Sequence, residues 1–100
     1  MKTTIDELLA FAAVVDTGSI TAAAEQLGLT ISATSRTLSR LEEKLKTTLL
    51  RRTTRRLELT EEGAAFLEHA RAILAMVDEA EEQMAARQMR PVGRLRVDAA

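Results

Sequence analysis

The sequence has no cysteine, one proline, two aromatic residues and no long apolar run. Without cysteine there is no disulfide framework and no thiolate metal site. No apolar stretch approaches the roughly 20 residues of a membrane-spanning helix. The N-terminal segment MKTTIDELLAF carries acids where a signal peptide has a basic and then an apolar stretch. These absences argue against a membrane protein and against a disulfide-rich secreted protein, and we expect a cytoplasmic location.

The residues that are present favour a small helical protein. One hundred residues with 46% hydrophobic content allow one small domain and a projecting element. Because Phe11 and Phe66 are the only aromatic residues, the core must consist of Leu, Ile, Val and Ala. Abundant alanine and a single proline, Pro91, point to helices.

Positive charge is concentrated in the middle of the chain, although the formal net charge is −1. Residues 36–56 contain eight Lys or Arg against two acids, whereas residues 1–35 and 57–100 are both net acidic. A local basic surface, more than the global charge, is the feature expected of a nucleic-acid-binding protein.

The segment from Thr30 to Leu45 predicts a helix with one buried and one polar face. Thr30 is a suitable N-cap, and Leu38, Leu41 and Leu45 have the 3-4 spacing of a buried stripe. The first turns of the polar face carry hydroxyls and arginine, with no acid before Glu42. Such a face suits the DNA major groove, where arginine contacts guanine or phosphate and hydroxyls contact bases and phosphates. A solvated surface helix is the alternative from this stretch alone.

Two further helices are expected before this segment. The first runs from a cap at Thr3 or Thr4 to about Asp16, and the second, capped by Ser19, covers Ile20–Leu27. A glycine-containing turn then leads into the third helix, which completes a helix-turn-helix pattern. The predicted buried stripe of the first helix comprises Ile5, Leu8, Leu9, Ala12 and Val15, widened by Phe11 and Val14.

The segment after the third helix predicts a basic β-hairpin. Residues 51–53 and 56–59 read as two short strands around a tight turn, because Leu57 and Leu59 alternate with charged residues. A basic hairpin directly after such a helix is typical of the wing of a winged helix, whose arginines reach phosphates or the minor groove. Charged hairpin tips also occur on ordinary proteins.

The last predicted helix runs from a cap at Thr60 to about Arg87, roughly 27 residues and about 40 Å long. A small domain cannot cover a helix of this length. An apolar seam with 4-3-4-3-4 spacing runs along it, at Phe66, Ala70, Ile73, Val77, Ala80 and Met84. A protruding apolar stripe needs a partner, most commonly a second copy in a twofold dimer. Near Phe66 the alternative is packing against the helix's own domain.

No pattern favours an enzyme or a metal protein. The sequence has no glycine-rich phosphate loop, and its single histidine, His69, has no second histidine four residues away. We expect His69 to be a partly exposed helix residue near the dimer seam. We also expect no cofactor and no metal.

The sequence resembles the N-terminal DNA-binding domain of LysR-type transcriptional regulators over roughly residues 4–90. The matching elements are Leu8 to Phe11, Gly18 to Thr21, Ala23-Ala24, Leu27, Ser35-Arg36, Leu41-Glu42, Leu49-Leu50, Arg52-Thr53, Leu59-Thr60 and Gly63. The resemblance implies a mainly α fold, in which a winged helix-turn-helix of three helices and a two-stranded β wing precedes a long dimerisation linker helix. It places the winged helix in residues 1–60, the linker helix in 61–88, and a hinge with the first strand of a C-terminal effector-binding domain in 89–100.

Pattern and resemblance together indicate a bacterial, sequence-specific transcription regulator in the nucleoid that binds an imperfect DNA palindrome as a homodimer. The expected contacts are Thr30, Ile31, Ser32, Ser35, Arg36 and Arg40 in the recognition helix, Arg52, Thr53, Arg55 and Arg56 in the wing, and Ser19 and Thr21 at phosphates. A small-molecule effector, and a tetramer of the full-length protein, would require the C-terminal domain. The alternative function is a winged-helix assembly module without DNA affinity.

Three departures from the family pattern affect the expected contacts. Ile31-Ser32 stand where the family usually has Gln-Pro, and isoleucine can contact a thymine methyl but cannot form the hydrogen bonds of glutamine. Lys46 replaces a glycine after the recognition helix. Leu50-Arg51 replace a common Phe and acid, which makes the base of the wing more basic.

Overall fold

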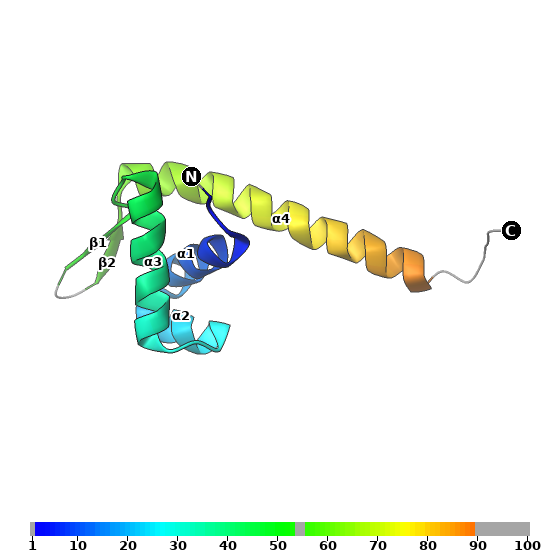
Figure 1. Cartoon of the computed structure of the whole chain (residues 1–100), viewed down its shortest axis with the longest axis horizontal. Coiled ribbons are helices and arrows are strands. Elements are labelled where there is room, and N and C mark those ends of the chain that lie inside the picture. The colour runs from blue at the N-terminus through cyan, green and yellow to red at the C-terminus, as the bar shows by residue number, and fades with distance from the viewer. Residues whose placement is uncertain (1, 54–55, 90–100) are drawn as a thin grey trace, which may run out of the picture.

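The computed structural model describes residues 2–53 and 56–89, which form a mainly helical winged helix-turn-helix with a long last helix (Figure 1). The elements are α1 (Ile5–Thr17), α2 (Ile20–Leu27), α3 (Ile31–Leu45), β1 (Leu50–Arg52), β2 (Leu57–Leu59) and α4 (Glu61–Met89). The expected fold is therefore confirmed. The strand expected in residues 93–100 lies outside the described residues.

The helix ends form where the local side-chain chemistry predicts them. The hydroxyls of Thr4, Ser19 and Thr30 accept hydrogen bonds of 3.2, 3.2 and 3.0 Å from backbone N–H groups in the first turns of α1, α2 and α3. Gly18 ends α1 in the left-handed region with a φ of 74°. Lys46 ends α3 with a φ of 55°, which is also in the left-handed region. Glycine adopts this conformation without strain, whereas lysine has a Cβ that disfavours it.

The core lies where α1 meets the other three helices, and α1 is its centre. Phe11 and Val14 are fully buried, and the Phe11 ring packs 5.8 Å from that of Phe66, which joins the start of α4 to the core. The buried stripe predicted for α1 is partly wrong, because Ile5 and Leu9 are 40% and 41% exposed. Ala10 and Ala13 are buried together with Phe11 and Val14, so the face of α1 that packs against the other helices does not include Ile5 and Leu9.

The two wing strands pair antiparallel, with Leu50 opposite Leu59. The first strand begins one residue earlier than predicted, at Leu50, because Leu50 pairs with Leu59. The carboxylate of Glu42 accepts hydrogen bonds of 2.8 and 3.1 Å from the N–H groups of Leu49 and Leu50. Glu42 belongs to α3, so these bonds hold the base of the wing against the third helix. Leu57 is half-buried, and Leu59 is 37% exposed.

Thr60 and Gly63 fix the start of α4 against the loop that precedes the wing. The Thr60 hydroxyl donates to the carbonyl of Thr48 at 2.7 Å and accepts from the N–H of Gly63 at 2.9 Å. A Cβ built on Gly63 would lie 2.1 Å from the carbonyl oxygen of Leu49. Only glycine permits this approach of the two backbones.

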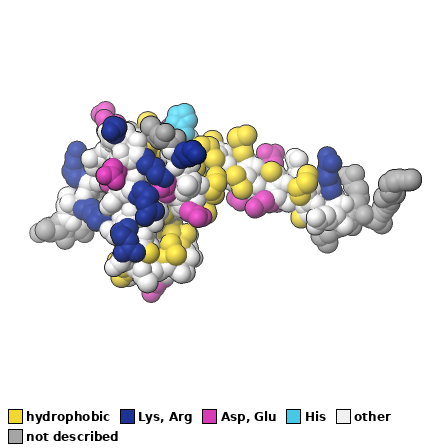
Figure 2. All heavy atoms as spheres, viewed as in Figure 1, with side chains coloured by type: hydrophobic (Ala, Val, Ile, Leu, Met, Phe, Trp, Pro, Cys, Tyr) yellow, Lys and Arg dark blue, Asp and Glu magenta, His cyan; other side chains and the backbone are white. Residues whose placement is uncertain are grey.

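Beyond this junction α4 projects from the domain (Figure 1). Its 29 residues correspond to about 43 Å, and Figure 2 shows hydrophobic side chains in a row along its exposed surface. Arg71 ties the helix to α1 through a 2.8 Å ion pair with Asp16. No helix within the described part of the chain is long and apolar enough to cross a membrane.

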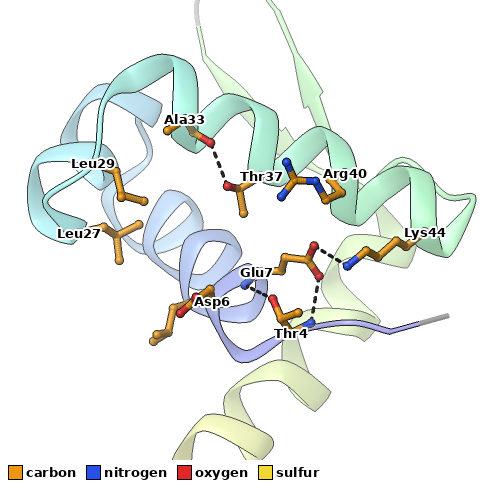
Figure 3. Close-up of a pocket in the computed structure, with 10 residues that line it drawn as sticks. Thr4, Asp6, Glu7, Leu27, Leu29, Ala33, Thr37, Arg40 and Lys44 are labelled. Atoms are coloured by element: carbon orange, nitrogen blue, oxygen red, sulfur yellow. Dashed lines mark hydrogen bonds and ion pairs between the residues drawn. The ribbon is translucent and has the colours of Figure 1, made fainter.

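A buried carboxylate sets the position of α3 relative to α1 (Figure 3). Glu7, only 3% exposed, accepts from the Thr4 N–H at 3.0 Å and forms a 2.7 Å ion pair with Lys44 of α3. Burial raises the pKa of Glu7, but the hydrogen bonds from Lys44 and Thr4 and the charges of Lys44 and Arg40 outweigh it, so the pKa lies below its ordinary value. The ionised form is therefore part of the folded structure.

We predict that Gly63→Ala destabilises the protein, although alanine usually stabilises a helix relative to glycine. The added methyl must displace the Leu49 backbone, and overpacking of this kind costs about 2 kcal/mol. Urea unfolding followed by circular dichroism measures the change. As a control, Ala64→Ser alters an exposed position in the same turn and should change the free energy of unfolding little. An unchanged or raised stability for Gly63→Ala would contradict the close approach.

A second prediction concerns pH. Because the pKa of Glu7 is lowered in the folded state, its ionised carboxylate stabilises the protein fully above the ordinary value of 4.5, and this contribution disappears as the pH falls through the folded pKa. The free energy of unfolding of Glu7→Gln should therefore lie below that of the wild type at pH 6, and the gap should shrink towards pH 3. Glu25→Gln, at an exposed position, controls for general charge effects. Parallel curves from pH 6 to pH 3 would contradict the prediction.

Candidate nucleic-acid interface

The outer face of α3 gathers four of the predicted contact residues. Ile31, Ser32, Ser35 and Arg36 line one shallow hollow together with Ser39. The opposite face of the helix is buried, with Thr34, Leu38 and Leu41 in the core. Ser39 was not among the predicted contacts, although it follows Ser32, Ser35 and Arg36 at the 3-1-3 spacing of one helix face. The hollow offers hydroxyls, one guanidinium and one apolar side chain.

The surface around this hollow is predominantly basic. Figure 2 shows the Lys and Arg side chains over α3 and the adjoining wing. The carboxylate of Glu42, the first acid of α3, is engaged by the N–H groups of Leu49 and Leu50. In the wing, Glu58 lies 3.8 Å from Arg56, and both side chains are well exposed. Positive charge and hydroxyl groups therefore lie side by side on α3 and the wing, as phosphate binding requires.

Thr30 and Arg40 are predicted contacts that lie outside the hollow. The hydroxyl of Thr30 is engaged in capping α3, where it accepts from the N–H of Ala33. Arg40 is exposed and lines a neighbouring pocket of 590 Å³ between α1 and α3, together with Thr37 and Lys44 (Figure 3). Arg40 therefore lies at the border between this pocket and the outer face of α3.

The wing presents its arginines on a short, well-bonded hairpin. Arg51 and Arg52 are exposed on β1, and their side chains point to opposite faces because side chains alternate along a strand. Thr53, a predicted contact, closes the turn: its N–H and hydroxyl both donate to the carbonyl of Arg56, at 2.9 and 2.8 Å. Arg55 lies outside the described residues. Arg51 is a further candidate that the prediction omitted, and its place in the basic run already indicated it.

The start of α2 places Ser19 and Thr21 next to each other. Ser19 is half-buried and its hydroxyl caps α2, whereas Thr21 is exposed. Of the two predicted phosphate contacts, Thr21 therefore has the more accessible side chain. A helix N-terminus of this kind also presents unpaired N–H groups to an anion.

The residues of the predicted seam lie on two different faces of α4 in the structure. Ala70 is fully buried and Phe66 packs on the core, whereas Val77 is half-buried. Ile73 and Met84 are 41% and 53% exposed, and Ala80 is exposed as well. The exposed face also carries His69 and Met76, the latter 68% exposed. Met76 was not in the predicted seam, because an alanine-rich helix allows more than one apolar spacing.

The acidic residues and the single histidine are spread over the described part of the chain. Among residues 2–53 and 56–89, no three His, Asp or Glu side chains lie close enough together to hold a metal ion. His69 is exposed on α4, as predicted, beside an apolar hollow lined by Leu45, Leu49 and Phe66.

Comparison with known proteins connects this arrangement to regulators of transcription. The family model described as bacterial regulatory helix-turn-helix protein, lysR family, matches residues 5–64. The HTH-type transcriptional regulator CrgA of Neisseria meningitidis serogroup C is 52% identical over 100 residues, which is all of this chain and 33% of that protein. This chain thus spans about a third of the length of such curated relatives.

Solved structures show the same fold. The crystal structure of the BenM DBD with catB site 1 DNA has a TM-score of 0.82 and 32% identity, covering 87% of this chain and 98% of that one. The structure of CrgA, a LysR-type transcriptional regulator from Neisseria meningitidis, has a TM-score of 0.76 and 50% identity, covering 92% of this chain and 31% of that one.

Proposed function

Since the chain belongs to the LysR family of bacterial helix-turn-helix regulators, we propose that residues 2–60 bind double-stranded DNA and that α4 joins two copies. The observation that carries this proposal is the outer face of α3. Ser32, Ser35, Arg36 and Ser39 lie together there, and no acid precedes Glu42 in the helix. The crystal structure of the BenM DBD with DNA supports the same role for a fold of this kind.

Each part of the basic surface has its own task in this proposal. Arg36 contacts guanine or phosphate from the major groove, and the hydroxyls of Ser32, Ser35 and Ser39 contact base edges or phosphates. Arg40 contacts the backbone at the border of the groove. Arg51, Arg52 and Arg56 of the wing, with Ser19 and Thr21 at the start of α2, bind flanking phosphates. The ion pair of Glu7 with Lys44 holds α3 in the orientation that this requires.

The dimer surface is the exposed face of α4, which we name the free stripe: Glu62, His69, Ile73, Met76, Ala80, Met84 and Arg87. All of these residues are exposed, and the apolar ones lie outside the core cluster of the described residues. Residues 62, 69, 73, 76, 80 and 87 repeat at the 3.5-residue average of a coiled-coil seam. A second copy is the partner that a self-complementary stripe fits.

Charge decides how the two helices run in this dimer. Consider an antiparallel pair in which Ile73 packs against the partner's Met76. In this register His69, four residues before Ile73, lies opposite the partner's Ala80. Seven residues further, Glu62 meets the partner's Arg87, so both ends carry an opposite-charge pair. A parallel pair would instead place Glu62 beside Glu62 and Arg87 beside Arg87. The antiparallel register is therefore the favourable one.

An apolar hollow at the domain end of α4 fits the same register. Leu45, Leu49, Ala65 and Phe66 are among its lining residues, and its volume is 330 Å³. In the antiparallel pair Ala65 lies opposite the partner's Met84. Methionine is flexible and fills irregular apolar spaces well. Each domain would therefore receive the distal end of its partner's α4.

The DNA-binding proposal predicts a steep salt dependence and a specific loss on mutation. About four phosphate contacts per protomer in a dimer give a log–log slope of affinity against salt of roughly −7. Arg36→Ala should weaken binding to a selected operator by more than about 1 kcal/mol, as measured by fluorescence anisotropy. Lys2→Ala removes the same charge outside α3 and the wing and should have a smaller effect. No binding even at low salt would favour the assembly-module alternative, and equal effects of the two variants would remove Arg36 from the site.

The dimer proposal predicts that Met76→Glu yields monomers in analytical ultracentrifugation, because an acid would be buried against the partner's Ile73. Ala75→Glu places the same charge on the neighbouring exposed residue, outside the free stripe, and should remain dimeric. Both variants should keep their helical circular dichroism.

Cysteine cross-linking tests the direction of the helices in a chain without native cysteine. Residues 65 and 84 are about 28 Å apart within one helix, so Ala65→Cys with Met84→Cys can cross-link only to a partner. The antiparallel pair predicts a disulfide-linked dimer for the double variant and little for either single variant. A cross-linked dimer of the Met84→Cys single variant would indicate a parallel pair instead.

A further inference from the structure

Ile31 is an exposed apolar residue on an otherwise polar surface. It is the first residue of α3 and is 52% exposed. The other side chains of its hollow are Ser32, Ser35, Arg36 and Ser39, all of them polar. Of the large hydrophobic side chains that the structure describes as exposed, Ile31 is the one that lines this hollow.

Folding of the domain does not explain this isoleucine. The core face of α3 is occupied by Thr34, Leu38 and Leu41, and the cap at Thr30 holds Ile31 in the first turn on the outer side. An exposed isoleucine gains little from burial in the folded monomer, and the first turn of a helix favours acidic or polar residues instead. A ligand that covers the hollow would bury the part of its apolar surface that the folded domain leaves exposed.

The chemistry of the major groove restricts what that ligand group can be. Base edges in the groove present hydrogen-bond donors and acceptors, and the apolar group among them is the C5-methyl of thymine. 5-Methylcytosine carries a methyl group at the same ring position. Isoleucine can form no hydrogen bond through its side chain, so it can distinguish bases only by contact with such a methyl.

We propose that Ile31 is a specificity-determining residue that packs against a pyrimidine C5-methyl group in each half-site of the operator. The proposal rests on the DNA-binding function proposed above and adds the chemical group that is recognised. Ser35 lies one turn after Ile31 on the same face, so its hydroxyl is placed to bond the polar edge of the same or the adjacent base pair.

The test begins with an operator selected from a randomised duplex pool. Each thymine is then replaced singly by deoxyuridine, which keeps every hydrogen-bonding group and removes only the methyl. At one thymine per half-site the wild-type protein should bind about fourfold more weakly, the effect of about one buried methyl-sized group. Ile31→Ala should bind the unmodified operator more weakly and should show no further loss on that replacement. Since Ile31 is exposed, this variant should unfold at the wild-type temperature.

Two further binding measurements identify the chemical group that Ile31 recognises. Arg36→Ala, altered in the same hollow, should keep the deoxyuridine sensitivity and serves as the matched control. At the sensitive position, 5-methylcytosine paired with guanine should bind more tightly than cytosine paired with guanine if the methyl alone is recognised. Equal binding of the two would limit the contact to thymine.

Two outcomes overturn the proposal. A selected operator that tolerates deoxyuridine at every position would show that no methyl is contacted, and equal sensitivity of Ile31→Ala and wild type would assign the methyl contact to another residue. In both cases the DNA-binding function itself would stand. If no sequence can be selected at all, the proposed function fails, and this inference fails with it.

Discussion

The close contact of the α4 backbone with the Leu49 carbonyl is the constraint on which the rest of the structure depends. Gly63 permits the contact, and Thr60 secures it by bonding Thr48 and the first turn of α4. The junction seats Phe66 beside Phe11 in the core and determines the direction in which α4 leaves the domain. That direction decides which face of α4 is buried against α1 and which remains exposed.

The residues that hold the domain together and those on its basic surface are largely different. Glu7 connects α3 to α1, and Glu42 connects α3 to the wing, so two carboxylates that do not line the hollow secure the third helix. Ser32 and Arg36 are exposed on that hollow and have no such structural bond among those described. A rigid helix with unoccupied polar groups requires little reorganisation when a ligand arrives.

Local signals in the sequence predicted the helix ends and the order of elements. The face of each helix that is buried depends on long-range packing, and local signals predicted it less well. A capping hydroxyl such as Thr30 acts within one turn, so its effect is visible in a short segment. The buried face of α1 depends on how closely three helices approach it, and Ile5 and Leu9 were therefore misplaced. The burial of Glu7 was also missed, although Thr4 and Glu7 have the spacing of a capping box.

Among the surface residues, too, some features follow from local sequence and others from long-range packing. The hydroxyl and arginine content of α3 is a property of the sequence itself, and the structure brings four of the six predicted contacts into one hollow. The exposed face of α4 was harder to predict, because alanines make several spacings equally apolar. Only the position of α1 distinguishes Ala70, which is buried, from Met76, which is exposed.

The length of α4 has a mechanical consequence. A helix of about 43 Å that is clamped at one end acts as a lever, so a tilt of about 5° at Gly63 displaces its far end by about 4 Å. Conversely, a force applied near Met84 exerts a torque on the clamp equal to the force multiplied by the length of the arm. In a pair of such levers, a small displacement at the distal ends changes the separation and relative angle of the two α3 helices without altering any side chain on them.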